Sequence, residues 1–145
     1  MNLNLEALET SFDLVASRGD ELMDVFYSRL FEVAPAVKPL FVTTDLHRQK
    51  TMLLGTLVLL RKSLRDLDAI APKLRELGAR HVAYGTEPEH YPVVGEVLLA
   101  AMSEVAGSAW CPRYEQAWAD ALAIVAFAML EGAESAESAK LEPAA

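Results

Sequence analysis

Few side chains in this 145-residue sequence have neighbours with which they could carry out chemistry. The three histidines, His47, His81 and His90, lack cysteine or carboxylate partners at the spacing of a protein-only zinc site. Cys111 has no neighbouring base, and the sequence contains neither a Gly-x-Ser-x-Gly elbow nor a glycine-rich phosphate loop. The sequence therefore does not indicate a hydrolase or a nucleotide-binding protein.

Three polar residues remain, each inside an apolar helical stretch. They are Tyr27 in an early segment, Gln49 at the start of a long apolar segment and His81 in a later one. Taken singly, each fits an ordinary role, because a helical histidine or tyrosine usually packs in the core and a glutamine is usually solvated. Whether these three residues form a functional site depends on the helices that position them.

Apolar residues recur at intervals of three and four through most of the chain, which predicts an all-α fold. The stripe of a first helix consists of Leu5, Leu8, Phe12 and Val15. Gly19 and Asp20 interrupt it, and Asp20 can cap a second helix that runs to about Val33. Pro35 and Pro39 then predict a short turn, because proline removes a backbone donor and restricts the preceding residue.

Thr43, Thr44 and Asp45 can cap a long helix from about 46 to 64, whose wide apolar face predicts deep burial. Asp66 or Asp68 can start the next helix, which ends near residues 84–85. The total is six or seven helices. Periodicity alone is also compatible with a four-helix bundle.

The segment Thr86-Glu87-Pro88-Glu89 predicts a capping box that opens a helix to about residue 105. Pro112 then opens a last helix that extends through Met129. From Glu134 onward the chain is too polar to pack. We therefore expect one domain over residues 1–134 and a flexible acidic, alanine-rich tail over residues 135–145.

The formal net charge of −8 argues against nucleic acid or an anionic membrane surface as a partner, since both require clustered basic residues. The longest apolar stretch, residues 52–60, is too short to cross a bilayer. Cys111 has no second cysteine for a disulfide, and the first residues lack the features of an export signal. We expect a cytoplasmic protein that is a monomer or a weak dimer.

Several segments, taken in order, resemble the single-domain globins of bacteria and the haem domain of flavohaemoglobins. The matching segments are Phe26-Tyr27-Ser28-Arg29-Leu30-Phe31 with Pro35 and Leu40-Phe41, Thr44-Asp45-Leu46-His47-Arg48-Gln49 with Leu53, residues 77–85 around His81, residues 90–99, and Trp118. The resemblance runs from about Leu5 to Met129. It implies the globin fold, a three-on-three helical sandwich around haem b (iron protoporphyrin IX).

The resemblance also implies a role for each matched residue. His81 would bind the iron, and Phe41 would press on the haem face. Tyr27 and Gln49 would face the opposite side, where a hydroxyl and an amide can donate hydrogen bonds to bound dioxygen. Leu53 would form a wall of this distal pocket. A change of register would bring His47 toward the iron instead, although a shift of two residues turns a helix by about 200°.

Other matched residues would lie around the haem. Arg80 and His90 are near enough to the iron ligand in sequence to pair with the haem propionates, and solvated positions fit them equally well. Tyr91 matches a tyrosine that lies beneath the haem in flavohaemoglobins and forms a network with a glutamate of the last helix. This chain departs from the family there, because the glutamate position is Ala133 and a nearby tyrosine position is Leu122.

Three functions follow as hypotheses. The first is reversible dioxygen binding for storage, delivery or sensing. The second is a nitric oxide dioxygenase, an enzyme that would need a separate reductase because this sequence carries no flavin or nicotinamide domain. The third is a helical interaction module without haem. The sequence assigns no catalytic residue and leaves the choice between carrier and enzyme open.

Overall fold

The computed structural model describes residues 3–41 and 45–141, and this part of the chain consists of helices and the turns between them. The elements, in chain order, are α1 (Leu5–Ala16), α2 (Gly19–Val33), the 3-10 helix η1 (Pro35–Phe41), α3 (Leu46–Lys62), α4 (Leu67–Ala83), α5 (His90–Ala106), the 3-10 helix η2 (Gly107–Ala109) and α6 (Pro112–Leu141). The prediction of an all-α fold is confirmed.

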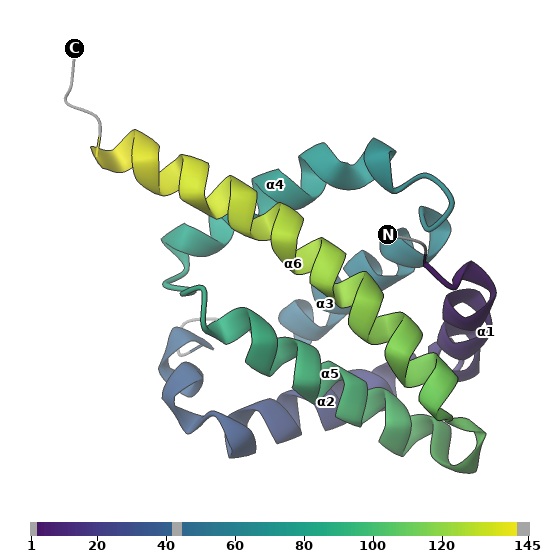
Figure 1. Ribbon diagram of the computed structural model, residues 1–145. Coiled ribbons are helices and arrows are strands. Elements are labelled where there is room, and N and C mark those ends of the chain that lie inside the picture. The colour runs from purple at the N-terminus through teal and green to yellow at the C-terminus, as the bar shows by residue number, and fades with distance from the viewer. Residues whose placement is uncertain (1–2, 42–44, 142–145) are drawn as a thin grey trace.

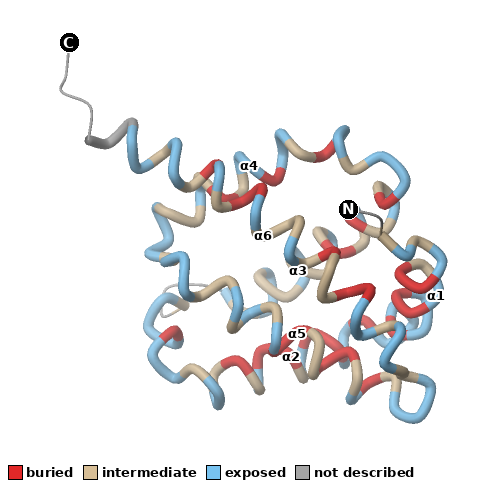
Figure 2. Tube along the Cα trace, viewed as in Figure 1, coloured by how far each residue is buried: buried red, intermediate tan, exposed pale blue. Residues whose placement is uncertain are grey.

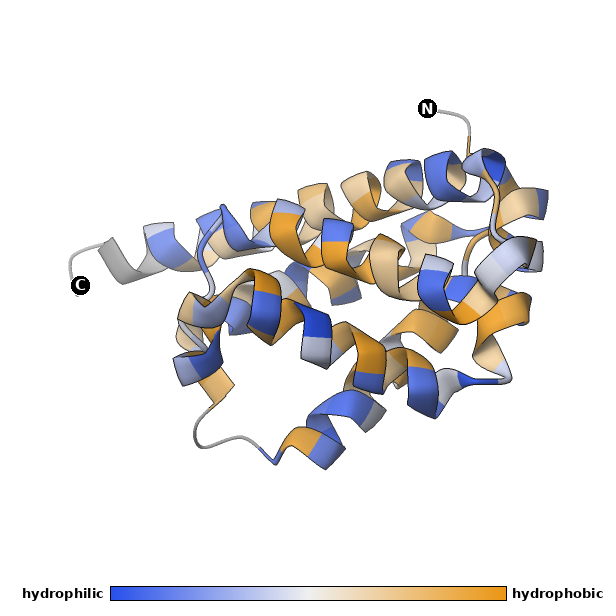
Figure 3. Cartoon of the chain, turned by 90° about the horizontal axis from the view of Figure 1, so that it is seen from below, coloured by the Kyte–Doolittle hydropathy of each residue, from blue (hydrophilic) through white to orange (hydrophobic). Residues whose placement is uncertain are grey.

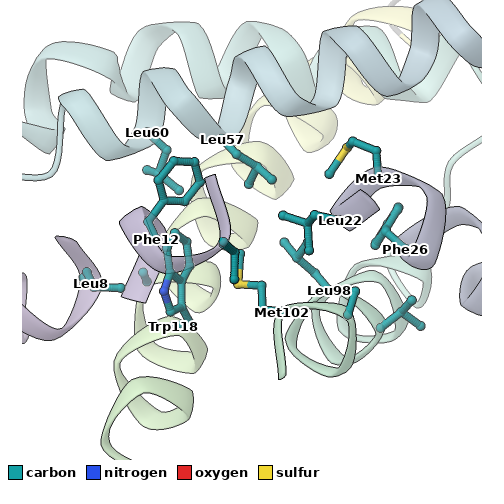
Figure 4. Packing of buried hydrophobic residues seen from close by; sticks show 14 of the residues in the cluster. Leu8, Phe12, Leu22, Met23, Phe26, Leu57, Leu60, Leu98, Met102 and Trp118 are labelled. Carbon is teal, nitrogen blue, oxygen red and sulfur yellow. The ribbon is translucent and has the colours of Figure 1, made fainter. Parts of the chain in front are cut away.

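The main core forms where α1, α2 and α5 meet the first half of α6 (Figure 1). Its side chains interdigitate in Figure 4, which labels Leu8, Phe12, Leu22, Met23, Phe26, Leu57, Leu60, Leu98, Met102 and Trp118. The predicted stripe of α1 is confirmed in part, because Leu8, Phe12 and Val15 are buried while Leu5 is only half-buried. Periodicity therefore identified the face of α1 that packs inward.

Trp118 and Ser11 form a polar contact inside this core. Both residues are fully buried, and the indole Nε1 of Trp118 donates a hydrogen bond to Oγ of Ser11 over 2.7 Å. The Ser11 hydroxyl in turn donates to the carbonyl of Ala7, four residues earlier, over 2.6 Å. The indole N–H thus has the partner that a buried donor needs, and α6 is tied to α1.

A second region of packing forms where α4 crosses α6. Figure 2 shows buried residues in the main core and again at this crossing, with exposed and half-buried residues between them. In Figure 3 each helix carries both apolar and hydrophilic residues, as expected of amphipathic helices that pack on one face. In this arrangement α4 packs against α6, whereas α3 packs against α2 and α1.

Two helix starts test the capping predictions. The Asp45 carboxylate accepts a hydrogen bond from the backbone N–H of Arg48 at 3.3 Å, so this predicted N-cap of α3 is confirmed; the predicted caps at residues 43 and 44 lie outside the described residues. The predicted Asp20 cap is wrong, because α2 already begins at Gly19. Asp20 instead lies in the first turn, where its negative charge suits the helix dipole.

The predicted capping box before α5 is also wrong. The helix begins at His90, and Glu89 makes no capping hydrogen bond with its side chain. A turn precedes the helix instead, in which the backbone N–H of Glu87 donates to Nδ1 of His90 over 3.0 Å. Gly85 enters this turn with φ of 88°, a conformation that favours glycine.

The deep burial predicted for the long helix is not observed in α3. Leu57 and Leu60 are its buried residues, whereas Met52 is 54% exposed and Leu53 is half-buried. The physical reason is that α4 packs on α6 rather than on α3, so a wide apolar face of α3 borders a cleft.

The last helix is longer than predicted. It continues past Glu134 to Leu141, so residues 135–141 of the predicted tail are helical in the structure. In Figure 1 this end of α6 projects beyond the other helices.

One segment, residues 90–109, is long and apolar enough by composition to cross a membrane. It consists of α5 and η2, and the buried residues of α5, such as Leu98 and Met102, pack in the core with α2. This packing is the environment of an amphipathic core helix.

We predict that Ser11→Ala lowers the free energy of unfolding by about 1–3 kcal/mol, because it leaves the indole N–H of Trp118 buried without a partner. Urea unfolding followed by circular dichroism measures the change. Thr10→Ala, at an exposed neighbouring position of α1, is the control and should change stability by less than about 0.5 kcal/mol. Equal stability of the two variants would contradict the prediction.

Candidate functional site

His81 lies in the last turn of α4, and a hydrogen bond to its own helix fixes its ring. Its Nδ1 is 2.7 Å from the backbone carbonyl of Leu77, four residues earlier. Because a carbonyl oxygen can only accept, Nδ1 carries the proton and Nε2 keeps its lone pair. The ring also packs edge to face on Tyr84, with centroids 5.4 Å apart. The structure therefore presents one nitrogen of His81 as a free ligand atom.

The surroundings of His81 favour the neutral imidazole. Burial lowers the pKa of His81 below its ordinary value, the hydrogen bond to Leu77 partly offsets this, and the positive charge of Arg80 lowers the pKa further. A neutral imidazole is the form that coordinates a metal ion. His81 thus has the orientation and the protonation state of a metal ligand.

Tyr27 and Gln49 come together from α2 and α3. Tyr27 is buried, and burial raises the pKa of its phenol above the ordinary value, while a hydrogen bond from the side chain of Gln49 partly lowers it. Tyr27 and Gln49 therefore lie side by side, and the phenol of Tyr27 is held in its protonated form by burial.

Aromatic side chains hold Tyr27 in place. Phe26 packs against its ring edge to face at a centroid distance of 4.9 Å, and Phe41, at the end of η1, does so at 5.9 Å. Phe31 contacts both Tyr27 and Phe41. Phe41 is half-buried, so the position predicted to press on a haem face packs here beside the hydroxyl-bearing ring.

The structure also distinguishes Gln49 from His47. His47 lies in the first turn of α3 with an exposed side chain, whereas Gln49 is half-buried and reaches Tyr27. Leu53, one turn after Gln49, is half-buried and packs against the core. The geometry favours the register in which Gln49, rather than His47, faces Tyr27.

Tyr91, in the first turn of α5, has a hydroxyl oxygen that is buried without a hydrogen-bond partner in the described part of the chain. Burial raises the pKa of this phenol, which keeps it protonated. Ala133 and Leu122 supply no side-chain acceptor. The proximal side of the site therefore differs from the tyrosine and glutamate network implied by the resemblance.

A cleft of about 330 Å³ lies between α3, α4 and α6. Its lining is mostly apolar but includes three charged residues, and it consists of Thr56, Leu59, Leu60, Ile70, Lys73, Leu74, Glu76, Leu77, Arg80 and Val125. It adjoins the turn that carries His81, although Tyr27 and Gln49 do not line it. The apolar lining suits an apolar group, and Lys73 and Arg80 can pair with carboxylates on it, although Glu76 belongs to the same lining.

The two residues predicted to pair with propionates differ in their surroundings. Arg80 is exposed and lines this cleft. His90 already accepts a hydrogen bond at Nδ1 from the backbone of Glu87, so only its Nε2 is available to another partner. Their roles stay predictions.

Comparison with known proteins agrees with this geometry. A profile of the globin family matches residues 24–129. The chain belongs to the globin family. Globins bind haem, which accords with the free nitrogen of His81 and the apolar cleft beside it.

This globin is 30% identical to a flavohemoprotein of Bacillus subtilis over 131 residues, and 33% identical to a flavohemoprotein of Rhodopirellula baltica over 132 residues. These alignments cover 89% and 88% of the chain. They cover 33% and 32% of the two relatives, so the chain spans about a third of their length.

Two solved structures share the fold. An engineered carbene transferase of Rhodothermus marinus, described as a candidate nitric oxide dioxygenase, superposes with a TM-score of 0.86 at 23% identity and covers 95% of this chain and 96% of its own. A bacterial globin from Campylobacter jejuni superposes with a TM-score of 0.80 at 22% identity and covers 92% and 96%. The globin fold expected from the sequence is confirmed.

Sequence reasoning missed two features of the site. The carbonyl of Leu77 orients His81, and the spacing of four residues within one helix could have suggested it. Lys73 joins Arg80 in the lining of the cleft, which depends on the course of α4 past α3. The sequence pattern contained no separate signal for Lys73.

We predict that His81→Ala weakens haem retention by more than about tenfold, since even the loss of an outer-shell partner costs about 10–100-fold in metal affinity. Transfer of haem to an acceptor apoprotein measures the rate of loss. His47→Ala, at an exposed position of α3, is the matched control and should retain haem like the parent. Loss of haem from His47→Ala but not from His81→Ala would identify a different ligand.

Proposed function

We propose that this globin binds haem b through Nε2 of His81 and binds dioxygen reversibly, for storage, delivery or sensing. When bound, haem supplies an iron centre that takes up dioxygen in its ferrous state. The observation that carries the proposal is the orientation of His81, whose Nδ1 is 2.7 Å from the carbonyl of Leu77, so that Nε2 is left for the iron.

The chain contributes two neutral hydrogen-bond donors to the distal side. The Tyr27 hydroxyl is held protonated by burial, and it can donate to the partial negative charge of a dioxygen ligand. Gln49 lies beside Tyr27, and its side-chain amide can donate as well. The aromatic rings of Phe26 and Phe41 keep the Tyr27 ring from turning away.

The proximal side favours a carrier over oxidative chemistry. His81 is oriented by the neutral carbonyl of Leu77, and no side-chain carboxylate among the described residues hydrogen-bonds to its ring. The Tyr91 hydroxyl is likewise without a partner in the part of the chain that the structure covers. These neutral groups give the imidazole of His81 no anionic partner that would raise its basicity as an iron ligand.

Nitric oxide dioxygenase activity is the alternative. It is supported by the flavohemoprotein relatives and by the similarity in fold to the candidate nitric oxide dioxygenase of Rhodothermus marinus. In that reaction nitric oxide, dioxygen and one electron give nitrate. A separate reductase would supply the electron and restore the ferrous state.

We predict that Tyr27→Phe speeds dioxygen dissociation about ten- to hundredfold, because a hydrogen bond to a charged acceptor contributes about 1.5–3 kcal/mol and about 1.4 kcal/mol corresponds to a factor of ten. Stopped-flow displacement of dioxygen measures the rate. Tyr114→Phe, on α6 against Trp110, is the control and should leave the rate unchanged. Equal rates in parent and Tyr27→Phe would refute the role given to the hydroxyl.

The carrier and the enzyme differ in turnover. We predict that the oxygenated protein converts about one equivalent of nitric oxide to nitrate and then stops, since the reaction consumes one electron per cycle. Nitrate is measured with and without an added flavin reductase and reduced nicotinamide. Sustained nitrate formation with rapid electron transfer from the reductase would favour the dioxygenase.

A further inference from the structure

The crossing of α4 and α6 brings two helix backbones into contact (Figure 1). A Cβ atom added at Gly78 on α4 would lie 1.9 Å from the carbonyl oxygen of Met129 on α6. A Cβ atom added at Gly132 on α6 would lie 1.8 Å from the carbonyl oxygen of Arg75 on α4. Ordinary contacts of such atoms begin near 3.4 Å, so neither position has room for a side chain.

The contact is reciprocal, since each helix contributes one glycine and one carbonyl. Arg75 and Gly78 are three residues apart on α4, and Met129 and Gly132 are three residues apart on α6, so each pair shares a helix face. Helices usually pack with their axes about 8–10 Å apart, because side chains separate them. Here the backbones themselves set the spacing.

This contact lies directly beside the residues that orient the iron ligand. Gly78 follows Leu77, whose carbonyl accepts the hydrogen bond from Nδ1 of His81. Gly78 is also buried and only three residues before His81, within the same helical turn. A displacement of α4 from α6 would therefore move both the imidazole and its hydrogen-bond partner.

We propose that Gly78 and Gly132 are positioning residues, which let α6 hold α4 at a fixed distance and thereby set the placement of Nε2 of His81. The inference rests on the proposed haem ligation by His81. The second half of α6 then has a role in addition to packing, because it determines the position of His81.

The chain offers matched controls for this inference. Gly55 on α3 and Gly95 on α5 also lie within helices, and a Cβ atom added at either would meet nothing within 4 Å. Gly55→Ala and Gly95→Ala make the same chemical change without disturbing a helix crossing. Any general effect of replacing a helical glycine should be the same in all four variants.

The experiment is resonance Raman spectroscopy of the haem-loaded ferrous protein without added ligand, which reports the iron–histidine stretching band. Gly132→Ala is the principal variant, because it leaves the sequence of α4 unchanged. We expect the band to shift in Gly132→Ala and, in the same direction, in Gly78→Ala. Gly55→Ala and Gly95→Ala should match the parent.

A second set of variants separates positioning from mere loss of stability. Met129→Ala removes a buried side chain at the crossing without inserting an atom, so it should fold if the glycine variants do not. We expect it to shift the band as well. Leu8→Ala, a buried truncation on α1, is its control and should leave the band in place. A band that stays unchanged in Met129→Ala and in the folded glycine variants would overturn the proposal.

A further comparison uses a variant in which the iron ligand is not attached to the chain. In His81→Gly supplied with free imidazole, the ligand is no longer attached to α4. Adding Gly132→Ala to that background should cause no shift, whereas a shift of equal size would mean that the crossing acts without His81. Absence of an iron–histidine band in the parent would refute the proposed haem ligation itself, and so is distinguishable from failure of the positioning role.

Discussion

The hydrogen bond between Nδ1 of His81 and the carbonyl of Leu77 is the interaction on which the site depends. It selects one tautomer, stops rotation of the ring and leaves Nε2 with a free lone pair. Burial lowers the pKa of His81 and keeps the ring neutral at this position. Because the acceptor belongs to the backbone of α4, the direction of the ligand follows the position of that helix, and α4 in turn rests on α6.

The two sides of the site differ in chemistry. The side proposed to face dioxygen has the protonated phenol of Tyr27 with Gln49 beside it, both suited to donating hydrogen bonds. The proximal side has a neutral imidazole bonded to a neutral carbonyl. Tyr91, for which the resemblance implied a network with a glutamate, has a buried hydroxyl and no partner in the described part of the chain. Because of this contrast we propose reversible dioxygen binding as the function and keep nitric oxide dioxygenase activity as the alternative.

Much of the fold could be predicted because local chemistry determined it. The spacing of Leu8, Phe12 and Val15 identified the buried face of α1, and Asp45 caps α3 as its side chain predicts. The start of α5 could not be predicted from the motif alone. The backbone N–H of Glu87 donates to the side chain of His90, so these residues form a turn and not a capping box. The exposure of α3 also depends on tertiary packing, because α4 lies on α6.

Only part of the site could be predicted from the sequence. Tyr27, Gln49 and His81 were selected by resemblance to a family, and the structure adds the pairing of the first two and the orientation of the third. The roles assigned to them stay predictions. Gly78 and Gly132 carried no signal, since a glycine within a helix predicts local weakness and its close contact with a distant carbonyl arises only in the folded chain.

The proposed site is tested most directly by the absorption spectrum of the haem-loaded ferrous protein without added ligand, recorded for the parent and for His47→Ala. His47 is exposed and Gln49 lies beside Tyr27, so we expect a five-coordinate, high-spin spectrum that is the same in both proteins. A six-coordinate, low-spin spectrum in the parent that becomes five-coordinate in His47→Ala would contradict the proposed site.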